Sequence, residues 1–395
     1  MSLTLKPLNL NLSTLLIEKL FMSQHYKKAG VDIHQGDKAS QILYQAARKT
    51  WKNRSHQLGE VITPFDDFTG LRVMAVGELP AGTVLGLGFD GVGTKVEIAE
   101  RIALHNTIAF DLFAMVCDDA VVRGGEPVLV GTVLDVNTLG RDDESYVKFI
   151  QQLADGYVKA AREAGVAVIN GELAELGVRV HGYGPFNYNW SAGVIWFALK
   201  ERMFTGFESK PGDALVGLQE EGFRSNGLSL VRRILRQNFG EEWHTQTVNE
   251  KNLGALVLKP SRIYTRAIVD MIGGVEGKPQ AKVHGVAHIT GGGIPGKLGR
   301  ILKPQKLGAQ VDSPFPPGDI VSFCQALGNV SDHEAYQTWN MGQGMIVVTP
   351  EPEGVIKIAR NHRIKAKIIG RVVKTPGITI VSQGAFKKDK VLKFS

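Results

Sequence analysis

The stretch of sequence that decides the fold is NTIAFDLFAMVCDDAVVRGGEPVLVGTV, residues 106–133. Its first part, residues 106–122, has apolar residues at helical spacing and predicts a long helix. The Gly-Gly-Glu-Pro segment that follows predicts a turn, because glycine and proline interrupt helices. The apolar run at residues 128–133 then predicts a buried strand. Helix, turn and strand in this order are typical of a protein whose helices pack on a sheet.

The alternation of strand-like and helix-like segments continues in two halves. A turn-rich stretch at residues 205–213, containing Pro211-Gly212, separates them. We expect an N-terminal domain at residues 26–203 and a C-terminal domain at residues 204–395. Residues 1–25 form a mildly amphipathic extension, which we expect to be a helix packed on the body or a disordered tail. The other expected elements are strands at residues 82–88, 166–169, 191–199, 214–217 and 286–289, and helices at residues 145–164 and 229–237.

The composition is that of a soluble globular protein. Of 395 residues, 43% are hydrophobic and 22% are charged. No apolar stretch approaches the roughly 18 residues that span a bilayer, and the N-terminus does not resemble a signal peptide. Cys117 and Cys324 lack disulfide or zinc spacing, as in a reducing compartment. The basic residues are scattered despite a pI of about 9.2. We expect a cytoplasmic protein that attracts phosphorylated metabolites and binds neither nucleic acid nor membrane.

Three acidic clusters each follow an apolar segment. They are Asp90 in DGVGTK, Asp118 with Asp119, and Glu172 with Glu175. Converging carboxylates require a cation, and oxygen ligands favour magnesium, which bridges protein acids and nucleotide phosphates. A nearby lysine, Lys95, would supply positive charge at a transferring phosphoryl group. These residues alone indicate a magnesium–nucleotide enzyme and do not identify its substrate.

A glycine-rich turn in the second half is a candidate phosphate contact. The segment GGGIPGKL at residues 291–298 falls one residue short of a nucleotide-binding P-loop. Leu298 stands where a Ser or Thr would hold magnesium, and Pro295 removes a backbone donor. We therefore reject a P-loop. The three glycines still allow backbone N–H groups to approach an anion.

Seven segments of the chain, in order, resemble the aminoimidazole ribonucleotide synthetase family, also called phosphoribosylformylglycinamidine cyclo-ligases. The resemblance covers about residues 26–375, and its segments YKKAGVDI and DGVGTK point to this family within a wider superfamily. The matching segments are YKKAGVDI (26–33), DGVGTK (90–95), DDAVVRGGEP (118–127), NGELAE (170–175), RSNGLSLVRRIL (224–235), AHITGGG (287–293) and GNVSDHEAYQTWNMGQGM (328–345).

This resemblance implies a fold and a reaction. The expected fold is α+β, with two α/β-layered domains and mixed sheets. The N-terminal domains would pair in a homodimer to form a shared β-barrel, with the ATP site in the cleft between domains. The implied activity uses ATP and Mg²⁺ to phosphorylate the formamide oxygen of formylglycinamidine ribonucleotide. The resulting iminophosphate closes to aminoimidazole ribonucleotide, a step of purine biosynthesis.

The resemblance also assigns roles to individual residues. The implied metal ligands are Asp90, Asp119 and Glu172. The implied catalytic residues are Lys95 and His288, and His333 is a further candidate for proton transfer. The nucleotide would contact the metal ligands and Lys28, Asp32, Gly91, Gly93 and Thr94. The substrate's ribose phosphate would contact Arg224, Ser225, Asn226, Gly227, Thr290, Gly291, Gly292 and Gly293.

The chain departs from the family pattern at several positions. Asp118 replaces the usual Asn, Leu173 the usual Thr, and Arg224 the usual His, while the usual glycine-rich loop is TPFDDFTGL at residues 63–71. A cationic Arg224 is expected to hold phosphate in place of the histidine. Two alternatives stay open: a divergent paralogue that phosphorylates another amide-like metabolite, and a non-catalytic nucleotide-binding regulatory homologue.

Overall fold

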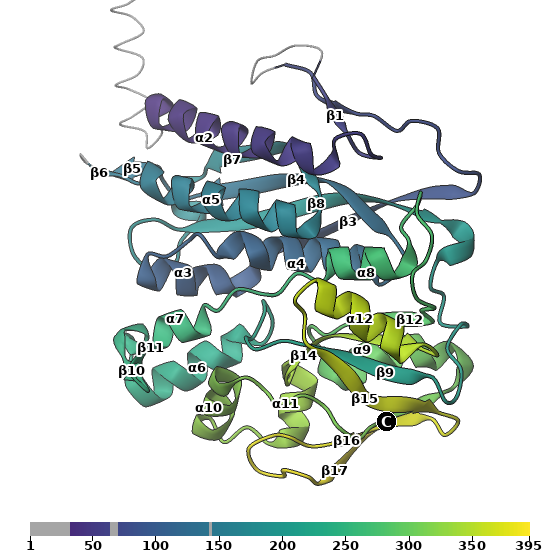
Figure 1. Cartoon of the computed structure of the whole chain (residues 1–395). Coiled ribbons are helices and arrows are strands. Elements are labelled where there is room, and N and C mark those ends of the chain that lie inside the picture. The colour runs from purple at the N-terminus through teal and green to yellow at the C-terminus, as the bar shows by residue number, and fades with distance from the viewer. Residues whose placement is uncertain (1–31, 64–69, 142–143) are drawn as a thin grey trace, which may run out of the picture.

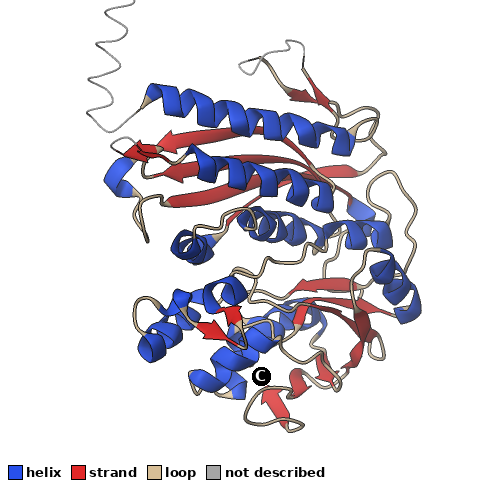
Figure 2. Cartoon of the chain, turned by 60° about the vertical axis from the view of Figure 1, so that its left-hand side comes forward, coloured by secondary structure: helices blue, strands red, loops and turns tan. Residues whose placement is uncertain are grey.

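The computed structural model describes residues 32–63, 70–141 and 144–395. The expected extension of residues 1–25 and the candidate nucleotide contact Lys28 lie outside the described residues. Figure 1 shows two halves stacked one on the other, each with its own sheet and packed helices. Figure 2 shows the two sheets as separate layers with helices between them. The fold is α+β with mixed sheets, as predicted.

The N-terminal half is built on a four-stranded sheet with the strand order β3-β8-β4-β7. Strands β4 and β7 run parallel, whereas β8 is antiparallel to β3 and β4. The strands are β3 (Thr83–Gly91), β4 (Glu126–Val136), β7 (Ala167–Glu175) and β8 (Tyr188–Leu199). The helices are α2 (Ile33–Trp51), α3 (Val96–Ile102), α4 (Ile108–Val121) and α5 (Val147–Ala164). Helices α2, α5 and α4 pack side by side on one face of the sheet (Figure 1).

The other face of this sheet carries exposed apolar side chains. Along β3, Leu85, Leu87 and Phe89 alternate with residues that face the helices, and Phe89 is 77% exposed. Val133 of β4 is also exposed on this face. A row of large apolar side chains on one sheet face is a candidate interface.

The C-terminal half is built on a seven-stranded sheet with the order β12-β14-β9-β15-β13-β16-β17. Strands β13 and β16 run parallel and the other neighbours run antiparallel. The strands are β9 (Ala214–Gln219), β12 (Gly285–His288), β13 (Gly308–Val311), β14 (Gln343–Thr349), β15 (Ala366–Val373), β16 (Gly377–Val381) and β17 (Val391–Phe394). The helices are α6 (Leu228–Phe239), α7 (Leu253–Val257), α8 (Thr265–Ile272), α9 (Gly293–Leu302), α10 (Asp319–Leu327), α11 (Asp332–Thr338) and α12 (Pro352–Asn361).

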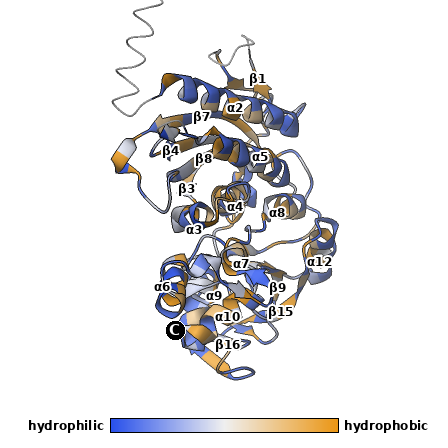
Figure 3. Cartoon of the chain, turned by 90° about the vertical axis from the view of Figure 1, so that its left-hand side faces the viewer, coloured by the Kyte–Doolittle hydropathy of each residue, from blue (hydrophilic) through white to orange (hydrophobic). Residues whose placement is uncertain are grey.

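Short antiparallel hairpins complete the described chain: β1 (Val61–Ile62) with β2 (Val73–Met74), β5 (Gly140–Arg141) with β6 (Glu144–Ser145), and β10 (Thr247–Val248) with β11 (Lys251–Asn252). The two halves meet through apolar side chains, because Val121 of α4 packs with α8 and with the central strands of the C-terminal sheet. Figure 3 shows α4 and α8 lying side by side above the C-terminal half. None of the helices in the described ranges is long and apolar enough to cross a bilayer.

Most of the expected elements are present. The helix expected at residues 106–122 is α4, and the strand expected at residues 128–133 is the centre of β4. The expected domain boundary at residue 204 falls between β8 and β9. The strand expected at residues 166–169 is longer than predicted. β7 continues to Glu175, because its pairing with β4 resumes after an irregularity at Val130 and Gly131.

Candidate active site between the two halves

An acid–histidine pair joins the two halves. Asp119, near the end of α4, lies 2.6 Å (Oδ1) from Nδ1 of His288, the last residue of β12. The Asp119 side chain is 54% exposed, whereas the His288 side chain is buried. The carboxylate of Asp119 is therefore exposed to solvent at the junction of the halves, and the buried imidazole of His288 holds it through a hydrogen bond.

Asp90 and Lys297 complete this cluster. Asp90 is exposed, but its partial desolvation raises its pKa, and the negative charge of Asp119 adds to the rise. Burial also acts to raise the pKa of Asp119, but the hydrogen bond from His288 and the positive charge of Lys297 outweigh it and lower the pKa. Lys297, in α9, was not predicted. The sequence feature that could have identified it is its place in the glycine-rich segment at residues 291–298, where it takes the position of a P-loop lysine.

Arg224 fixes the position of the proton on His288. Nη2 of Arg224 lies 2.7 Å from Nε2 of His288. A guanidinium can only donate, so Nε2 accepts and the ring proton lies on Nδ1, from which it is donated to Asp119. Both ring nitrogens are therefore engaged by protein groups. This arrangement favours a positioning role for His288 over the predicted proton transfer to substrate.

Arg224 itself does not face the cleft. Its buried guanidinium donates to Asp118 Oδ2 at 3.0 Å and to Glu220 Oε2 at 3.1 Å. Asp118 also accepts hydrogen bonds from the backbone of Tyr264 and from Thr265 Oγ1. The predicted phosphate contact by Arg224 is wrong, because its charge is neutralised by buried acids and its terminal nitrogens have protein partners. Asp118 and Asp119 do point in different directions, as successive helical residues must.

Lys95 is likewise internal. Its side chain is fully buried, and Nζ lies 2.6 Å from Asp111 Oδ1 and 2.6 Å from the carbonyl oxygen of Lys259. Since Lys259 belongs to the second half, Lys95 links the two halves. The predicted role at a transferring phosphoryl group is not supported, because that role needs an ammonium that reaches a ligand.

Glu172 does not join Asp90 and Asp119 within one chain. The pairing register places Gly91, Ser191, Val133 and Glu172 in one row across the sheet. Residues in one row share a face, so Glu172 lies with exposed Val133, and Asp90 faces the opposite side. Three strand spacings of about 4.8 Å also separate the two acids by about 14 Å. The predicted convergence of three acids is therefore wrong for a single chain, and the described residues contain no cluster of three metal-ligating side chains.

Two helix N-termini form a candidate phosphate site. Gly227 precedes α6 and Gly292 precedes α9, with φ angles of 71° and 94° that favour glycine. The two turns are adjacent, since a Cβ placed on Gly291 would lie 3.6 Å from Asn226 Oδ1. Ser225 Oγ is buried and has no hydrogen-bond partner among the described residues. The structure thus brings together the predicted substrate residues except Arg224, namely Ser225, Asn226, Gly227, Thr290, Gly291, Gly292 and Gly293. The N–H of Gly293 is donated to the carbonyl oxygen of Thr290, and the first-turn N–H groups and dipoles of the two helices favour an anion there.

The glycine-rich turn after Asp90 borders the acidic cluster. Gly91 ends β3, and its N–H donates to Asp90 Oδ1 at 2.7 Å. Gly93 has a φ of 68° and is exposed, as is Thr94. Gly93 and Thr94 are therefore exposed within four residues of Asp90, whereas the N–H of Gly91 is taken by Asp90 itself. His333 lies elsewhere, because its ring stacks on Phe394 of β17.

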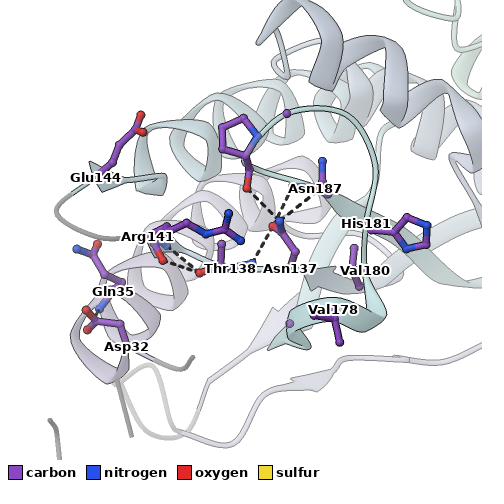
Figure 4. Close-up of a pocket in the computed structure, with 14 residues that line it drawn as sticks. Asp32, Gln35, Asn137, Thr138, Arg141, Glu144, Val178, Val180, His181 and Asn187 are labelled. Carbon is purple, nitrogen blue, oxygen red and sulfur yellow. Dashed lines mark hydrogen bonds between the residues drawn. The ribbon is translucent and has the colours of Figure 1, made fainter. Parts of the chain in front are cut away.

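Asp32 lies in a separate pocket of about 610 Å³ in the N-terminal half (Figure 4). Its side chain accepts hydrogen bonds from the backbone of His34 and Gln35 at the start of α2. Figure 4 shows Arg141, Asn137 and His181 around the same space. Asn187 also lines this pocket. It lies five residues before Ala192, which is the residue paired with Asp90 across the sheet. That is roughly 15 Å along an extended chain, so Asp32 is not part of the Asp90–Asp119 cluster of the same chain.

Comparison with known proteins places the chain in a family. The family models described as AIR synthase related protein, N-terminal and C-terminal domain, match residues 72–193 and 210–383. A phosphoribosylformylglycinamidine cyclo-ligase from Geobacillus sp. strain WCH70 is 35% identical over 91% of this chain and 98% of its own. The chain belongs to the phosphoribosylformylglycinamidine cyclo-ligase family. A second relative with that description, from Nitrosococcus oceani, is 33% identical over 90% of this chain and 94% of its own.

Solved structures show that the fold of this cyclo-ligase family member is shared more widely. The hydrogenase maturation protein HypE in complex with ATP has a TM-score of 0.53 and 15% identity, covering 80% of this chain and 86% of its own. A thiamine-monophosphate kinase from Stenotrophomonas maltophilia also has a TM-score of 0.53, with 14% identity over 87% of this chain and 97% of its own. At such low identity these likenesses concern the fold alone.

Proposed function

We propose that the chain is an ATP-dependent cyclo-ligase that converts formylglycinamidine ribonucleotide to aminoimidazole ribonucleotide in purine biosynthesis. The relatives matched over nine-tenths of the chain carry that name. The structural observation that supports the proposal most is the proximity of Asp119, His288 and Lys297 to the adjacent turns at the N-termini of α6 and α9. The part of the site around Asp119 suits a metal-bound polyphosphate, and the turns at the N-termini of α6 and α9 suit the phosphate of a ribonucleotide.

The acidic cluster fits magnesium. Mg²⁺ keeps several waters and takes one or two carboxylates together with substrate phosphates. Asp90 and the exposed Asp119 would supply the carboxylates, which accounts for two of the three predicted ligands. When bound, the ion would neutralise developing charge on the phosphoryl group and relieve the repulsion between the two acids.

The protein groups around this site would act mainly by positioning. His288 holds Asp119 in one orientation, and Lys297 adds positive charge beside both acids. The N-terminal turns of α6 and α9 would anchor the ribose phosphate of the substrate through backbone N–H groups. Held in this way, the formamide oxygen would take the phosphoryl group, and an amidine nitrogen of the same molecule would displace phosphate from the iminophosphate to close the ring. Such a reaction needs orientation and charge stabilisation, and no covalent nucleophile.

The exposed face of the N-terminal sheet supports a homodimer. Strands β3 and β7 are the two edges of this sheet, and edges with unpaired backbone groups favour pairing with another chain. Pairing β3 of one copy with β7 of a second copy would close a barrel and cover Leu85, Leu87 and Phe89. Such closure would also bring Glu172 of the second copy to the edge strand that carries Asp90. Glu172 would still project into the barrel and Asp90 to its outside, so the closure places these two acids on adjacent strands without joining them in one metal site.

Three of the four family departures do not call for a different substrate, and the fourth, the loop at residues 63–71, lies mostly outside the described residues. Asp118 and Arg224 are buried against each other, and Leu173 packs against the hydrophobic core. None of these three side chains faces the candidate site. The burial of these three side chains therefore weakens the case for a paralogue that acts on another amide.

The test is to incubate the chain with ATP, Mg²⁺ and formylglycinamidine ribonucleotide and to measure both ADP and aminoimidazole ribonucleotide. Both products are expected from the wild type, and neither from Asp119→Asn, which removes the exposed metal carboxylate. ADP without the imidazole product would indicate a paralogue with another substrate. Neither product from the wild type would indicate the non-catalytic alternative.

A further inference from the structure

A second cavity, of about 790 Å³, lies along α9 in the C-terminal half and shares only Gly292 with the residues of the candidate active site. On α9 it is lined by Gly292, Pro295, Gly296, Gly299, Arg300, Leu302 and Lys303. Successive helical residues are about 100° apart, so the centre of this stripe lies roughly 140° around the helix from Lys297. Lys297 faces Asp90 and Asp119, and the stripe faces a different space.

The rim of this cavity is strongly basic. Arg300, Lys303, Lys306 and Lys393 are exposed around it, and its lining side chains include no Asp or Glu. None of these four cations forms an ion pair within the described ranges of the chain. The main-chain carboxyl group of Ser395, which also lines the cavity, offsets one of these four charges, and the remaining excess of positive charge would attract an anion.

The floor of the cavity is apolar and partly aromatic. Leu302, Leu307 and Ile378 line it, and Phe394 of β17 is covered by the ring of His333. The two rings are stacked, with centroids 4.4 Å apart, and His333 is itself exposed. The outer face of His333 therefore offers a flat surface to a ligand. A Cβ on Gly296 would meet no atom within 4 Å, so the space above this part of α9 is open.

We propose that this cavity binds a small phosphate ester with a flat apolar group, the chemistry of a nucleoside monophosphate. The phosphate would lie among Lys303, Lys306 and Lys393, and the flat group would stack on His333. The volume is in the range of small-molecule sites, which combine an apolar lining with a few placed charges. This binding site is distinct from the Asp119–His288 cluster and does not depend on the cyclo-ligase activity.

The probe is AMP, titrated by calorimetry into the full chain, with adenosine and inorganic phosphate as partial ligands. The double variant Lys306→Glu with Lys393→Glu reverses two rim charges, and Gly296→Leu fills the cavity without a predicted clash. Each is expected to abolish one AMP-binding event or weaken it at least tenfold. Lys251→Glu, a charge reversal at an exposed lysine in β11, is the matched control and should leave that event unchanged.

Asp119→Asn separates this cavity from the active site. The proposed binding event should persist in Asp119→Asn, whereas an event at the ATP site should be weakened. Adenosine should bind at least tenfold more weakly than AMP, because it lacks the charge that the rim recognises. The proposal is overturned if every AMP-binding event survives both cavity variants, or if adenosine binds as tightly as AMP. Circular dichroism spectra of the variants that match the wild type would show that lost binding is not lost folding.

Discussion

Asp118 and Arg224 lie 106 residues apart in the sequence and form a buried ion pair of 3.0 Å between α4 and the turn before α6. Both positions depart from the pattern of the resembled family, which has Asn and His there. The two departures therefore meet in one contact at the junction of the halves. Through His288, the same arginine is connected to Asp119, the exposed acid of the candidate site.

This pair should behave as a coupled unit in stability measurements. Arg224→Met leaves Asp118 buried without its countercharge, and we expect a loss of about 3–5 kcal/mol in the free energy of unfolding. Asp118→Asn should also destabilise the protein. In the double variant the loss of unfolding free energy should be smaller than the sum of the two single losses by about 1–3 kcal/mol, because the effects of substituting residues in contact are not additive. Urea unfolding followed by tryptophan fluorescence measures all three, and additive losses would show that the pair is not an energetic unit.

The positioning role of His288 can be separated from proton transfer by two amide substitutions. The side-chain amide nitrogen of Asn takes roughly the place of Nδ1, so His288→Asn can still donate to Asp119. We expect kcat for ADP formation within about tenfold of wild type, or roughly 1.4 kcal/mol. His288→Ala should lower kcat for ADP formation about a hundredfold. His288→Gln should lower it as much as His288→Ala, because the amide nitrogen of Gln takes the place of Nε2 and cannot donate to Asp119. Equal losses in Asn and Ala would instead indicate that the imidazole transfers a proton.

The sequence predicted the layers better than the contacts between them. The apolar spacing in residues 106–133 predicted α4 and β4 because periodicity follows from local burial. The 100° step between helical residues also predicted that Asp118 and Asp119 diverge, as the structure shows. Glu172 was misplaced for a local reason. The sequence placed Glu172 after a strand that ends at residue 169, but pairing with β4 continues the strand to Glu175 and fixes which face Glu172 occupies.

The partners of the buried charges could not be predicted. Lys95 pairs with Asp111 and the carbonyl of Lys259, and Arg224 pairs with Asp118. Lys95 and Asp111 pair within the N-terminal half, whereas the contacts Lys95–Lys259 and Arg224–Asp118 join the two halves and depend on how the halves dock. A lysine in a glycine-rich turn and an arginine before Ser-Asn-Gly have the sequence signature of ligand contacts. Burial, which only the tertiary structure shows, makes them internal links.

The proposed homodimer predicts a specific sensitivity on the open face of the N-terminal sheet. Phe89→Asp places a charge on a side chain that is 77% exposed in one chain and would be covered in the dimer. We expect the wild type to sediment as a dimer at micromolar concentration and Phe89→Asp as a monomer. Phe207→Asp, at another exposed phenylalanine outside the sheet, is the matched control and should remain dimeric. A monomeric wild type, or a dimeric Phe89→Asp, would contradict the shared barrel.

The buried histidine of the N-terminal half should govern part of the acid sensitivity. His105 is 1% exposed, its Nδ1 lies 3.1 Å from the Tyr188 hydroxyl, and the rings of Phe149 and Phe186 pack around it. Burial lowers the pKa of His105 from 6.5 to about 4, because the cluster offers a charged imidazole no counterion.

The sign of the pH effect follows from that lowered pKa. The unfolded chain takes up the proton below pH 6.5, whereas the folded chain does so only below about 4. The contribution of His105 is thus fully present above pH 6.5 and is lost as the pH falls from 6.5 to about 4, by about 3 kcal/mol. His105→Phe keeps an aromatic ring in the cluster and removes the titration. Urea unfolding at pH 7 and pH 4 should show the wild type losing about 3 kcal/mol more than His105→Phe. Equal losses in the two proteins would mean that His105 is charged, or becomes solvated, in the folded state.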